Sequence, residues 1–291
     1  MTEHQGNGNR PNQRVIDLFD RYTHGGMDRR QFLEKLTILA GSSAAALALL
    51  PTLENNYAQA ELLPEGDPRI KTETIDVKGT KVYLASPTSG EKWPSVLVIH
   101  ENRGLNPHIK DVTRRLAAEG FLAGGADFLS VAGGTPSDED KAREMIGALD
   151  KPATEAAARD VVAALRARSD SNGKVGAIGF CWGGGLVNRL AVTDPTLDAG
   201  VAYYGMQADP KDVAQIKAPL LLHYAGLDER INAGIPAYEA ALKAEGKRFE
   251  LHIYDGANHA FNNDTNTARY DKKAADLAWS RTVAFLHKSL A

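Results

Sequence analysis

The chain of 291 residues contains one cysteine, Cys181, so it cannot close an intrachain disulfide. It has no cluster of Cys and His residues at zinc-binding spacing, and we therefore expect no metal site. It also lacks a run of clustered Lys and Arg, and its net charge is −3. Phosphate binding needs such clusters, so we do not expect nucleic acid as a partner.

Long apolar runs are scarce as well. The uncharged, moderately apolar run at residues 36–50 (LTILAGSSAAALALL) is shorter than the ~20 residues that a membrane-spanning helix needs. Arg29 and Arg30 precede this run, and the triplet Ala58-Gln59-Ala60 follows it. A basic region, a short apolar run and an A-x-A site are typical of a cleavable export signal, and an uncleaved membrane anchor is the alternative. Paired arginines just before Phe-Leu resemble the twin-arginine type, whose cargo crosses the membrane already folded.

We therefore predict that residues 1–60 are a leader with a twin-arginine-type signal peptide and that residues 61–291 form the mature domain. The export machinery is then a partner, no permanent membrane span is expected, and the protein is periplasmic or secreted. Residues 15–19 suggest an amphipathic segment within this long leader, and Met27 is an alternative start.

What the chain does contain is the composition of a globular protein, with 24% charged and 43% apolar residues. The part after residue 60, about 230 residues, suits one α/β domain. Residues 72–77 and 80–86 alternate apolar and polar side chains around Gly79, which predicts an antiparallel hairpin. Six later apolar runs lack strict alternation, as is typical of strands covered on both faces. These runs are residues 95–100, 121–126, 174–180, 199–205, 219–226 and 249–255.

Helical patterns lie mostly between these runs. They cover residues 109–119, 152–168, 185–192, 235–245 and 267–290. Alternating strands and helices predict an α/β fold with a doubly wound, mostly parallel sheet, helices on both faces and the hairpin at one edge. Ligands of such sheets bind at the carboxyl ends of the strands, so the residues that follow each run are the candidates for chemistry.

The stretch GFCWGGG at residues 179–185 places the single cysteine between a predicted strand and a predicted helix. A nucleophile on such a turn has a strained backbone, and the residues two before and two after it must be small. Gly179 and Gly183 occupy these positions, so G-x-C-x-G stands where hydrolases usually have G-x-S-x-G. The start of the following helix also favours a thiolate. We therefore predict that Cys181 is a nucleophile rather than a buried structural cysteine.

A thiol nucleophile needs a base, and the chain order in this topology is nucleophile, acid, histidine. Asp228 and His259 follow the last two predicted strands, in the required order and at the required sheet edge. We predict a catalytic triad of Cys181, Asp228 and His259, with Asp255 as the alternative acid.

The residues after the first strand of the parallel group are His100, Glu101 and Asn102. In such sheets this loop supplies one backbone N–H of an oxyanion hole, and the residue after the nucleophile supplies the other. We assign these two donors to Asn102 and Trp182. His100 and Glu101 suggest a metal as the alternative, but no third ligand is spaced to help.

Together these residues resemble the dienelactone hydrolase family, a cysteine branch of the α/β-hydrolases. The resemblance covers roughly residue 72 to the C-terminus and rests on HENRG, SNGKVGAIGFCWGGG, AGLD and NHAF. It implies the α/β-hydrolase fold, no cofactor, and attack on an enol-lactone carbonyl that gives a thioester acyl-enzyme, which water then hydrolyses. In that family a glutamate placed like Glu101 holds the resting thiol.

The chain departs from the family pattern where the substrate is held. The family has serine directly after the catalytic histidine and arginine four residues after it, to bind a substrate carboxylate. Here Ala260 and Asn263 stand at those positions. Arg103 and Arg143 are the candidate replacements, with a solvated surface arginine as the alternative for each. Phe261 is a further candidate for the substrate pocket, with aromatic core packing as its alternative.

The resulting hypothesis is a monomeric exported hydrolase of the carboxymethylenebutenolidase type that acts on a small-molecule ester or lactone. Two alternatives remain open. One is a thiol acyltransferase or peptidase, and the other is a non-catalytic binding protein on a hydrolase scaffold.

Overall fold

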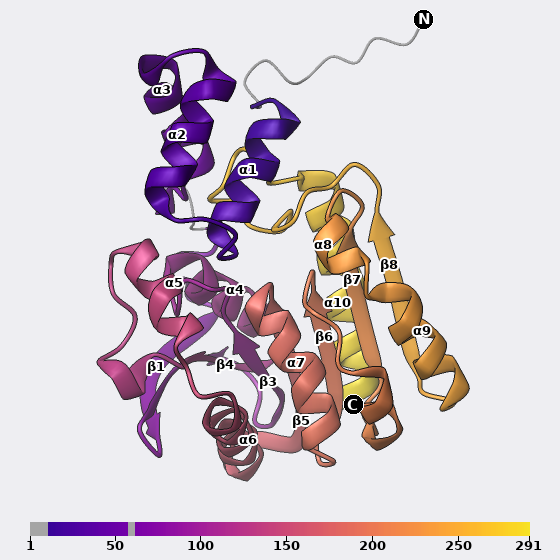
Figure 1. The fold of residues 1–291 in the computed structure, drawn as a ribbon. Coiled ribbons are helices and arrows are strands. Elements are labelled where there is room, and N and C mark those ends of the chain that lie inside the picture. The colour runs from indigo at the N-terminus through magenta and orange to yellow at the C-terminus, as the bar shows by residue number, and fades with distance from the viewer. Residues whose placement is uncertain (1–10, 58–61) are drawn as a thin grey trace, which may run out of the picture.

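The computed structural model describes residues 11–57 and 62–291, and an eight-stranded sheet lies at the centre of this described part (Figure 1). The strands are β1 (Ile70–Val77), β2 (Thr80–Pro87), β3 (Trp93–Ile99), β4 (Leu122–Asp127), β5 (Ser171–Phe180), β6 (Ala199–Tyr203), β7 (Leu220–Ala225) and β8 (Phe249–Tyr254). Their order is β1-β2-β4-β3-β5-β6-β7-β8. The β1–β2 and β2–β4 pairs are antiparallel, and the others are parallel. The predicted mostly parallel sheet with a hairpin at one edge is confirmed.

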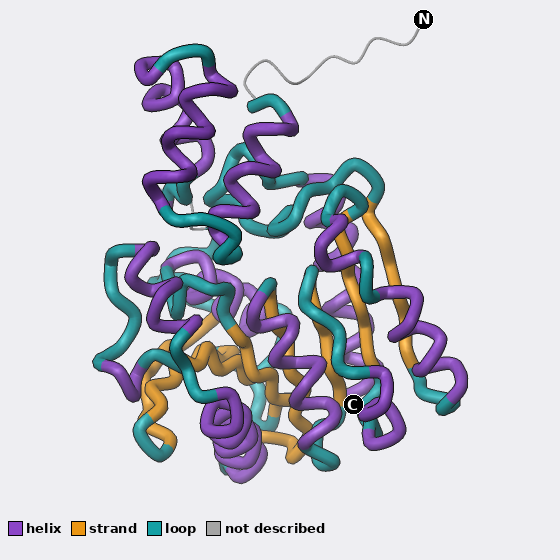
Figure 2. Tube along the Cα trace, viewed as in Figure 1, coloured by secondary structure: helices purple, strands orange, loops and turns teal. Residues whose placement is uncertain are grey.

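Helices cover both faces of the sheet (Figure 2). They are α4 (Pro107–Ala118), α5 (Glu139–Gly147), α6 (Lys151–Ala167), α7 (Trp182–Thr193), α8 (Glu229–Asn232), α9 (Ile235–Ala244) and α10 (Lys272–Leu290). Leu165 of α6, Leu190 of α7 and Leu242 of α9 are fully buried on one face. Val112 of α4 and Leu286 of α10 are fully buried on the other. The five predicted helices are present, and the short helices α5 and α8 were not predicted.

Three further helices precede the sheet and lie together at one end of the molecule (Figure 1). They are α1 (Gln13–Thr23), α2 (Arg29–Ala40) and α3 (Ser43–Leu53). The predicted amphipathic segment is α1, which buries Val15, Ile16 and Phe19 in a cluster with Phe32 and Leu36 of α2. These helices therefore have a small apolar core of their own.

The apolar run at residues 36–50 is bent in the structure. Gly41, with φ +80°, ends α2, and Ser42 caps α3, so the two helices meet at an angle of 112°. Within the described ranges, no single helix is long and apolar enough to cross a membrane, although α2 and α3 together reach that length and composition. The predicted cleavage triplet at 58–60 and the boundary at residue 61 lie outside the described residues.

Polar contacts attach residues 11–57, which we call the N-terminal segment, to the domain that carries the sheet. The Tyr22 hydroxyl donates to Asp140 of α5 at 2.5 Å. At the other end of the segment, Nδ2 of Asn266 donates to the carbonyl oxygen of Leu53, also at 2.5 Å. The segment is thus fixed to two separate parts of the domain.

Candidate active site

Cys181 lies on the sharp turn between β5 and α7, and its side chain is 8% exposed. Its backbone has φ 54° and ψ −114°, which is a strained conformation for a residue with a side chain. A Cβ atom at Gly179 would lie 2.2 Å from the carbonyl oxygen of Gly183, and one at Gly183 would lie 2.5 Å from the carbonyl oxygen of His100. Only glycine fits at either position. The turn therefore holds the sulfur at the carboxyl edge of the sheet.

Asp228 and His259 meet beside this sulfur, in loops that follow β7 and β8. Nδ1 of His259 lies 2.5 Å from Oδ2 of Asp228, and both side chains are buried. Nε2 of His259 has no hydrogen-bond partner among the described residues, and a ring nitrogen of His259 lies within 4.8 Å of the Cys181 sulfur. Because Nδ1 faces Asp228, Nε2 is the nitrogen that can exchange a proton with the sulfur or with a water next to it. Asp255, the alternative acid, is exposed.

A second histidine, which the sequence patterns did not indicate, reaches the sulfur from the N-terminal segment. Nε2 of His24, directly after α1, lies 3.3 Å from Sγ of Cys181. Nδ1 of His24 lies 2.8 Å from the carbonyl oxygen of Asp20 and 3.2 Å from its Oδ1. The His24 ring meets the His259 ring edge-on, with 4.6 Å between centroids. The sequence signal was the four-residue spacing of Asp20 and His24, which puts both on one helix face but does not say where the helix docks.

Opposite charges in this cluster shift the pKa values of its members. Burial favours the neutral thiol, but the imidazoles of His259 and His24 outweigh it and lower the pKa of Cys181 to about 5. Burial also opposes the charged form of His259, yet Asp228 and the Cys181 thiolate hold its pKa well above the usual value. Cys181 and Asp20 raise the pKa of His24 in the same way, again against burial. The lowered pKa of Cys181 and the raised pKa values of His259 and His24 together favour a thiolate beside charged imidazoles.

Trp182 and Asn102, the predicted oxyanion-hole residues, follow β5 and β3, which are neighbours in the sheet. Trp182 is the first residue of α7, where backbone N–H groups have no partner inside the helix. Its ring stacks on His100, with 5.2 Å between centroids. Asn102 is buried, and its Nδ2 donates to the carbonyl oxygen of Thr23 at 2.7 Å. Donation by the two backbone N–H groups to an oxyanion stays a prediction.

Glu101 is buried in the loop after β3, with partners other than the sulfur. Nδ2 of Asn263 donates to Oε2 of Glu101 at 2.8 Å, and the Tyr204 hydroxyl lies 3.5 Å from Oε1. Among the hydrogen bonds of the described residues, the bond to the Cys181 sulfur comes from His24. Control of the resting thiol by Glu101 stays a prediction, and His24 is better placed for that task.

The predicted substrate-binding residues are engaged within the protein. Nε of Arg103 donates to Oε2 of Glu139 at 2.7 Å, and Arg103 is buried. Arg143 pairs with Asp140 at 3.0 Å. Phe261 is fully buried among tyrosine rings. Contact of these residues with substrate stays a prediction, and either arginine would have to exchange a carboxylate partner to bind an anionic substrate.

Three atoms of kinds that zinc accepts come together at this site. The three atoms are a ring nitrogen of His24, Sγ of Cys181 and a ring nitrogen of His259, and they lie within 4.8 Å of one another. These residues are far apart in the chain, so sequence spacing did not indicate them. A shared proton accounts for the 3.3 Å between His24 and the sulfur, and we interpret the group as a thiolate–imidazole cluster.

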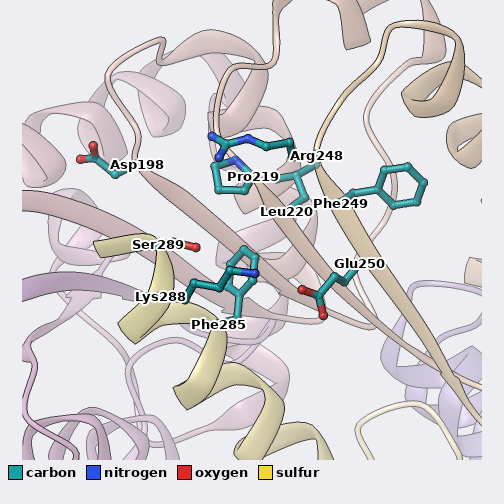
Figure 3. Close-up of a pocket in the computed structure, with 9 residues that line it drawn as sticks. All are labelled: Asp198, Pro219, Leu220, Arg248, Phe249, Glu250, Phe285, Lys288 and Ser289. Carbon is teal, nitrogen blue, oxygen red and sulfur yellow. The ribbon is translucent and has the colours of Figure 1, made fainter. Parts of the chain in front are cut away.

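A hollow of about 340 Å³ lies at the opposite edge of the sheet (Figure 3). Leu220 and Phe249, the first residues of β7 and β8, line it together with Phe285 and Lys288 near the end of α10. Parallel strands begin at one edge and end at the other. The hollow is therefore separated from the cluster around Cys181, which lies at the carboxyl ends.

The strand order and the strained turn between β5 and α7 together define an α/β-hydrolase. The chain belongs to the dienelactone hydrolase family, because the model described as "Dienelactone hydrolase family" matches residues 80–290. Two relatives carry the name "Putative carboxymethylenebutenolidase". The one from Saccharolobus solfataricus is 34% identical over 251 residues and covers 73% of this chain and 96% of its own. The one from Methylorubrum extorquens is 32% identical over 268 residues and covers 86% of this chain and 91% of its own.

A solved structure agrees with the family assignment, and a second family model matches the N-terminal segment. The crystal structure of a "Putative Dienelactone Hydrolase" from Klebsiella pneumoniae has a TM-score of 0.68 and 26% sequence identity, and covers 75% of this chain and 99% of that chain. The model described as "YqhI-like" matches residues 11–41, which include α1, His24 and α2. The segment thus carries a sequence pattern of its own.

Proposed function

We propose that the protein is a monomeric carboxylic ester hydrolase that cleaves a small ester or lactone through Cys181, His259 and Asp228. One observation carries the proposal. The His259–Asp228 pair, 2.5 Å apart, leaves Nε2 of His259 without a partner, and a ring nitrogen of His259 lies within 4.8 Å of a sulfur on a strained strand-to-helix turn. The name shared by the relatives supports the substrate class.

In this mechanism the Cys181 thiolate attacks the carbonyl carbon of the substrate, and the carbonyl electron pair moves to the oxygen. The backbone N–H groups of Trp182 and Asn102 donate to that oxyanion. The C–O bond then breaks, the leaving oxygen takes a proton from His259, and a thioester remains on the sulfur. Water gives a proton to His259, attacks the thioester and releases the acid and the thiolate. Asp228 orients the imidazole and stabilises its charged form.

The same chemistry restricts the substrate. A thiolate is itself a good leaving group, so the tetrahedral intermediate reverts unless the departing oxygen leaves readily. Asn263 bonds to Glu101 and offers no charge to a substrate carboxylate. Arg103 and Arg143 already pair with carboxylates of the protein. We therefore propose an enol lactone or another activated ester, on which a carboxylate matters little.

The test combines three variants with a trapping experiment. Cys181→Ala and His259→Ala should each lower kcat by on the order of 10⁴-fold or more while the protein stays folded, because triad members act as a unit. Asp228→Asn should cost on the order of 10³–10⁴-fold, since it leaves the histidine in the wrong tautomer. Mass spectrometry of the parent with an enol lactone should show an acyl group on Cys181. Near-normal turnover by Cys181→Ala would contradict the proposal.

Two further measurements refine the proposal. An acyl group that passes to an added alcohol or amine in preference to water would indicate an acyltransferase, and faster cleavage of a peptide than of esters would indicate a peptidase. A matched pair of lactones with and without a carboxylate should differ in kcat/KM by less than about 100-fold, which corresponds to about 2.7 kcal/mol.

We also propose that Arg29 and Arg30 direct the folded protein to the twin-arginine export route and thus to the periplasm or the exterior. The supporting pattern is the arginine pair followed by the apolar run at residues 36–50.

A further inference from the structure

Cys181 lies between two Asp–His pairs. The first pair, Asp228 and His259, comes from the loops after β7 and β8. The second pair, Asp20 and His24, comes from α1 and the turn that follows it. When a carboxylate and a carbonyl oxygen occupy Nδ1 of an imidazole, Nε2 remains for another partner. In His24 that partner is the sulfur, 3.3 Å away.

The Asp20–His24 pair is fixed to the domain that carries the sheet. Asn102, in the loop after β3, donates at 2.7 Å to the carbonyl oxygen of Thr23, which is the residue directly before His24. Arg269 is 2% exposed, and its Nη1 lies 3.9 Å from Oδ1 of Asp20. A buried guanidinium without a carboxylate would be strongly unfavourable, so this ion pair favours the docked position of α1.

The core of the N-terminal segment supports the same position. Tyr22 and Phe32 stack at 4.6 Å between centroids, and both rings are buried. Nε2 of Gln13 donates at 2.5 Å to Oδ1 of Asn258, the residue before His259. The "YqhI-like" pattern covers the same stretch. His24 is therefore placed by a folded unit with its own core rather than by a loose end of the chain.

We propose that His24 is a catalytic residue, which donates a hydrogen bond to the Cys181 thiolate and holds it ready in the resting enzyme. The proposal rests on the proposed role of Cys181 as the nucleophile. Under this proposal the N-terminal segment contributes a residue to catalysis. His24 then controls the resting thiol, a role that the family resemblance implied for Glu101. The other charged or titratable groups around the sulfur are Asp20, Glu101, Tyr204, Asp228, His259 and Arg269.

The test is the pH dependence of Cys181 alkylation by iodoacetamide. The chain has no other cysteine, so the reaction reports this sulfur alone and needs no substrate. Because the pKa of the thiol is lowered, the parent should keep its thiolate down to a pH of about 5. In His24→Gln the midpoint should rise by about one pH unit, which means about tenfold less thiolate at pH values below the midpoint. Asp20→Asn should shift it less, because the imidazole remains and only its carboxylate partner is lost.

The matched control is His108→Gln. His108 is also buried and paired with an aspartate, with Nδ1 2.8 Å from Oδ1 of Asp264, but it is outside the cluster around the sulfur. In His108→Gln the alkylation midpoint of Cys181 should equal that of the parent. The acid limb of kcat/KM for an activated ester should move to higher pH in His24→Gln by the same amount as the alkylation midpoint.

Two results would overturn the proposal: an unchanged midpoint in a His24→Gln protein that melts like the parent, or a rise in its kcat/KM at every pH. The second result would mean that His24 obstructs the site. A shifted midpoint in His24→Gln together with full turnover by Cys181→Ala would support the contact between His24 and the sulfur, but it would contradict the proposed function and with it the catalytic role of His24. An unchanged midpoint in His24→Gln with inactive Cys181→Ala would contradict the role of His24 alone.

Discussion

At the scale of single residues, the charge of the Cys181 sulfur is set by two histidines from opposite ends of the chain. His259 belongs to a loop of the hydrolase sheet, and His24 belongs to the N-terminal segment. Two imidazoles beside one thiolate stabilise it more than one does, which is why the pKa of the thiol falls to about 5 although burial opposes ionisation. The Cys181 sulfur is thus charged below neutral pH.

Glu101 provides a test between the family resemblance and the observed contacts. Glu101→Gln should leave the alkylation midpoint of Cys181 closer to the parent than His24→Gln does, because Glu101 bonds to Asn263 and Tyr204 while His24 bonds to the sulfur. Both variants replace a titratable group by the same neutral amide. Alkylation rates measured in one buffer series would decide, and a larger shift for Glu101→Gln would show that the carboxylate governs the thiol.

The candidate site was predictable where it depends on strand ends and not where it depends on docking. Cys181, Asp228 and His259 each follow a strand, and the ends of parallel strands meet at one edge, so their order in the chain was enough to bring them together. His24 is 157 residues from Cys181, and no local pattern says that α1 packs over that edge. The amide of Asn263 was expected only as a missing arginine, whereas in the structure it donates to Glu101.

At the scale of elements, the strands were predicted within a few residues because continuous apolar runs mark buried strands. The bounds of the helices were predicted less precisely. The pattern for α10 begins at residue 267, yet the helix starts at Lys272. Asp271 is its N-cap and accepts a hydrogen bond from the Ala274 N–H. The short helix α8 has four residues, which is too few for a periodic pattern.

The packing of α1 against α2 makes a prediction about access to the sulfur. Phe32 is 1% exposed at the centre of this contact, so Phe32→Ala should destabilise the docked segment by about 3–5 kcal/mol. Alkylation of Cys181 should then change in rate and shift to a higher midpoint, because His24 leaves the sulfur for part of the time. Ile38, on the same helix and 78% exposed, provides the control Ile38→Ala. Identical alkylation in parent and Phe32→Ala would show that the position of His24 does not depend on this core.

At the scale of the whole molecule, the proposed export and the proposed role of His24 both depend on the N-terminal segment. Replacing Arg29 and Arg30 by lysine should leave the protein in the cytoplasm, because lysine keeps the charge and loses the arginine pair. Cell fractionation with intact-mass measurement gives both the location and the N-terminus. The cleavage at 58–60 that the sequence pattern predicts would separate His24 from the domain, so it conflicts with the proposed role of His24. If His24 has that role, the active form should still contain residues 11–57. Unchanged location of the double variant, or a fully active protein that begins at Glu61, would contradict these expectations.

The partial burial of the apolar run in α2 and α3 bears on the timing of the proposed export. Leu36 is fully buried in the docked segment, whereas Ile38 is 78% exposed and Leu47 is 62% exposed. A transport receptor that needs the whole run would bind it only before the segment docks, when His24 does not contact Cys181. Transport and catalysis would then exclude each other in time. Cys181 would acquire the reactivity of the docked state only after the receptor releases the chain.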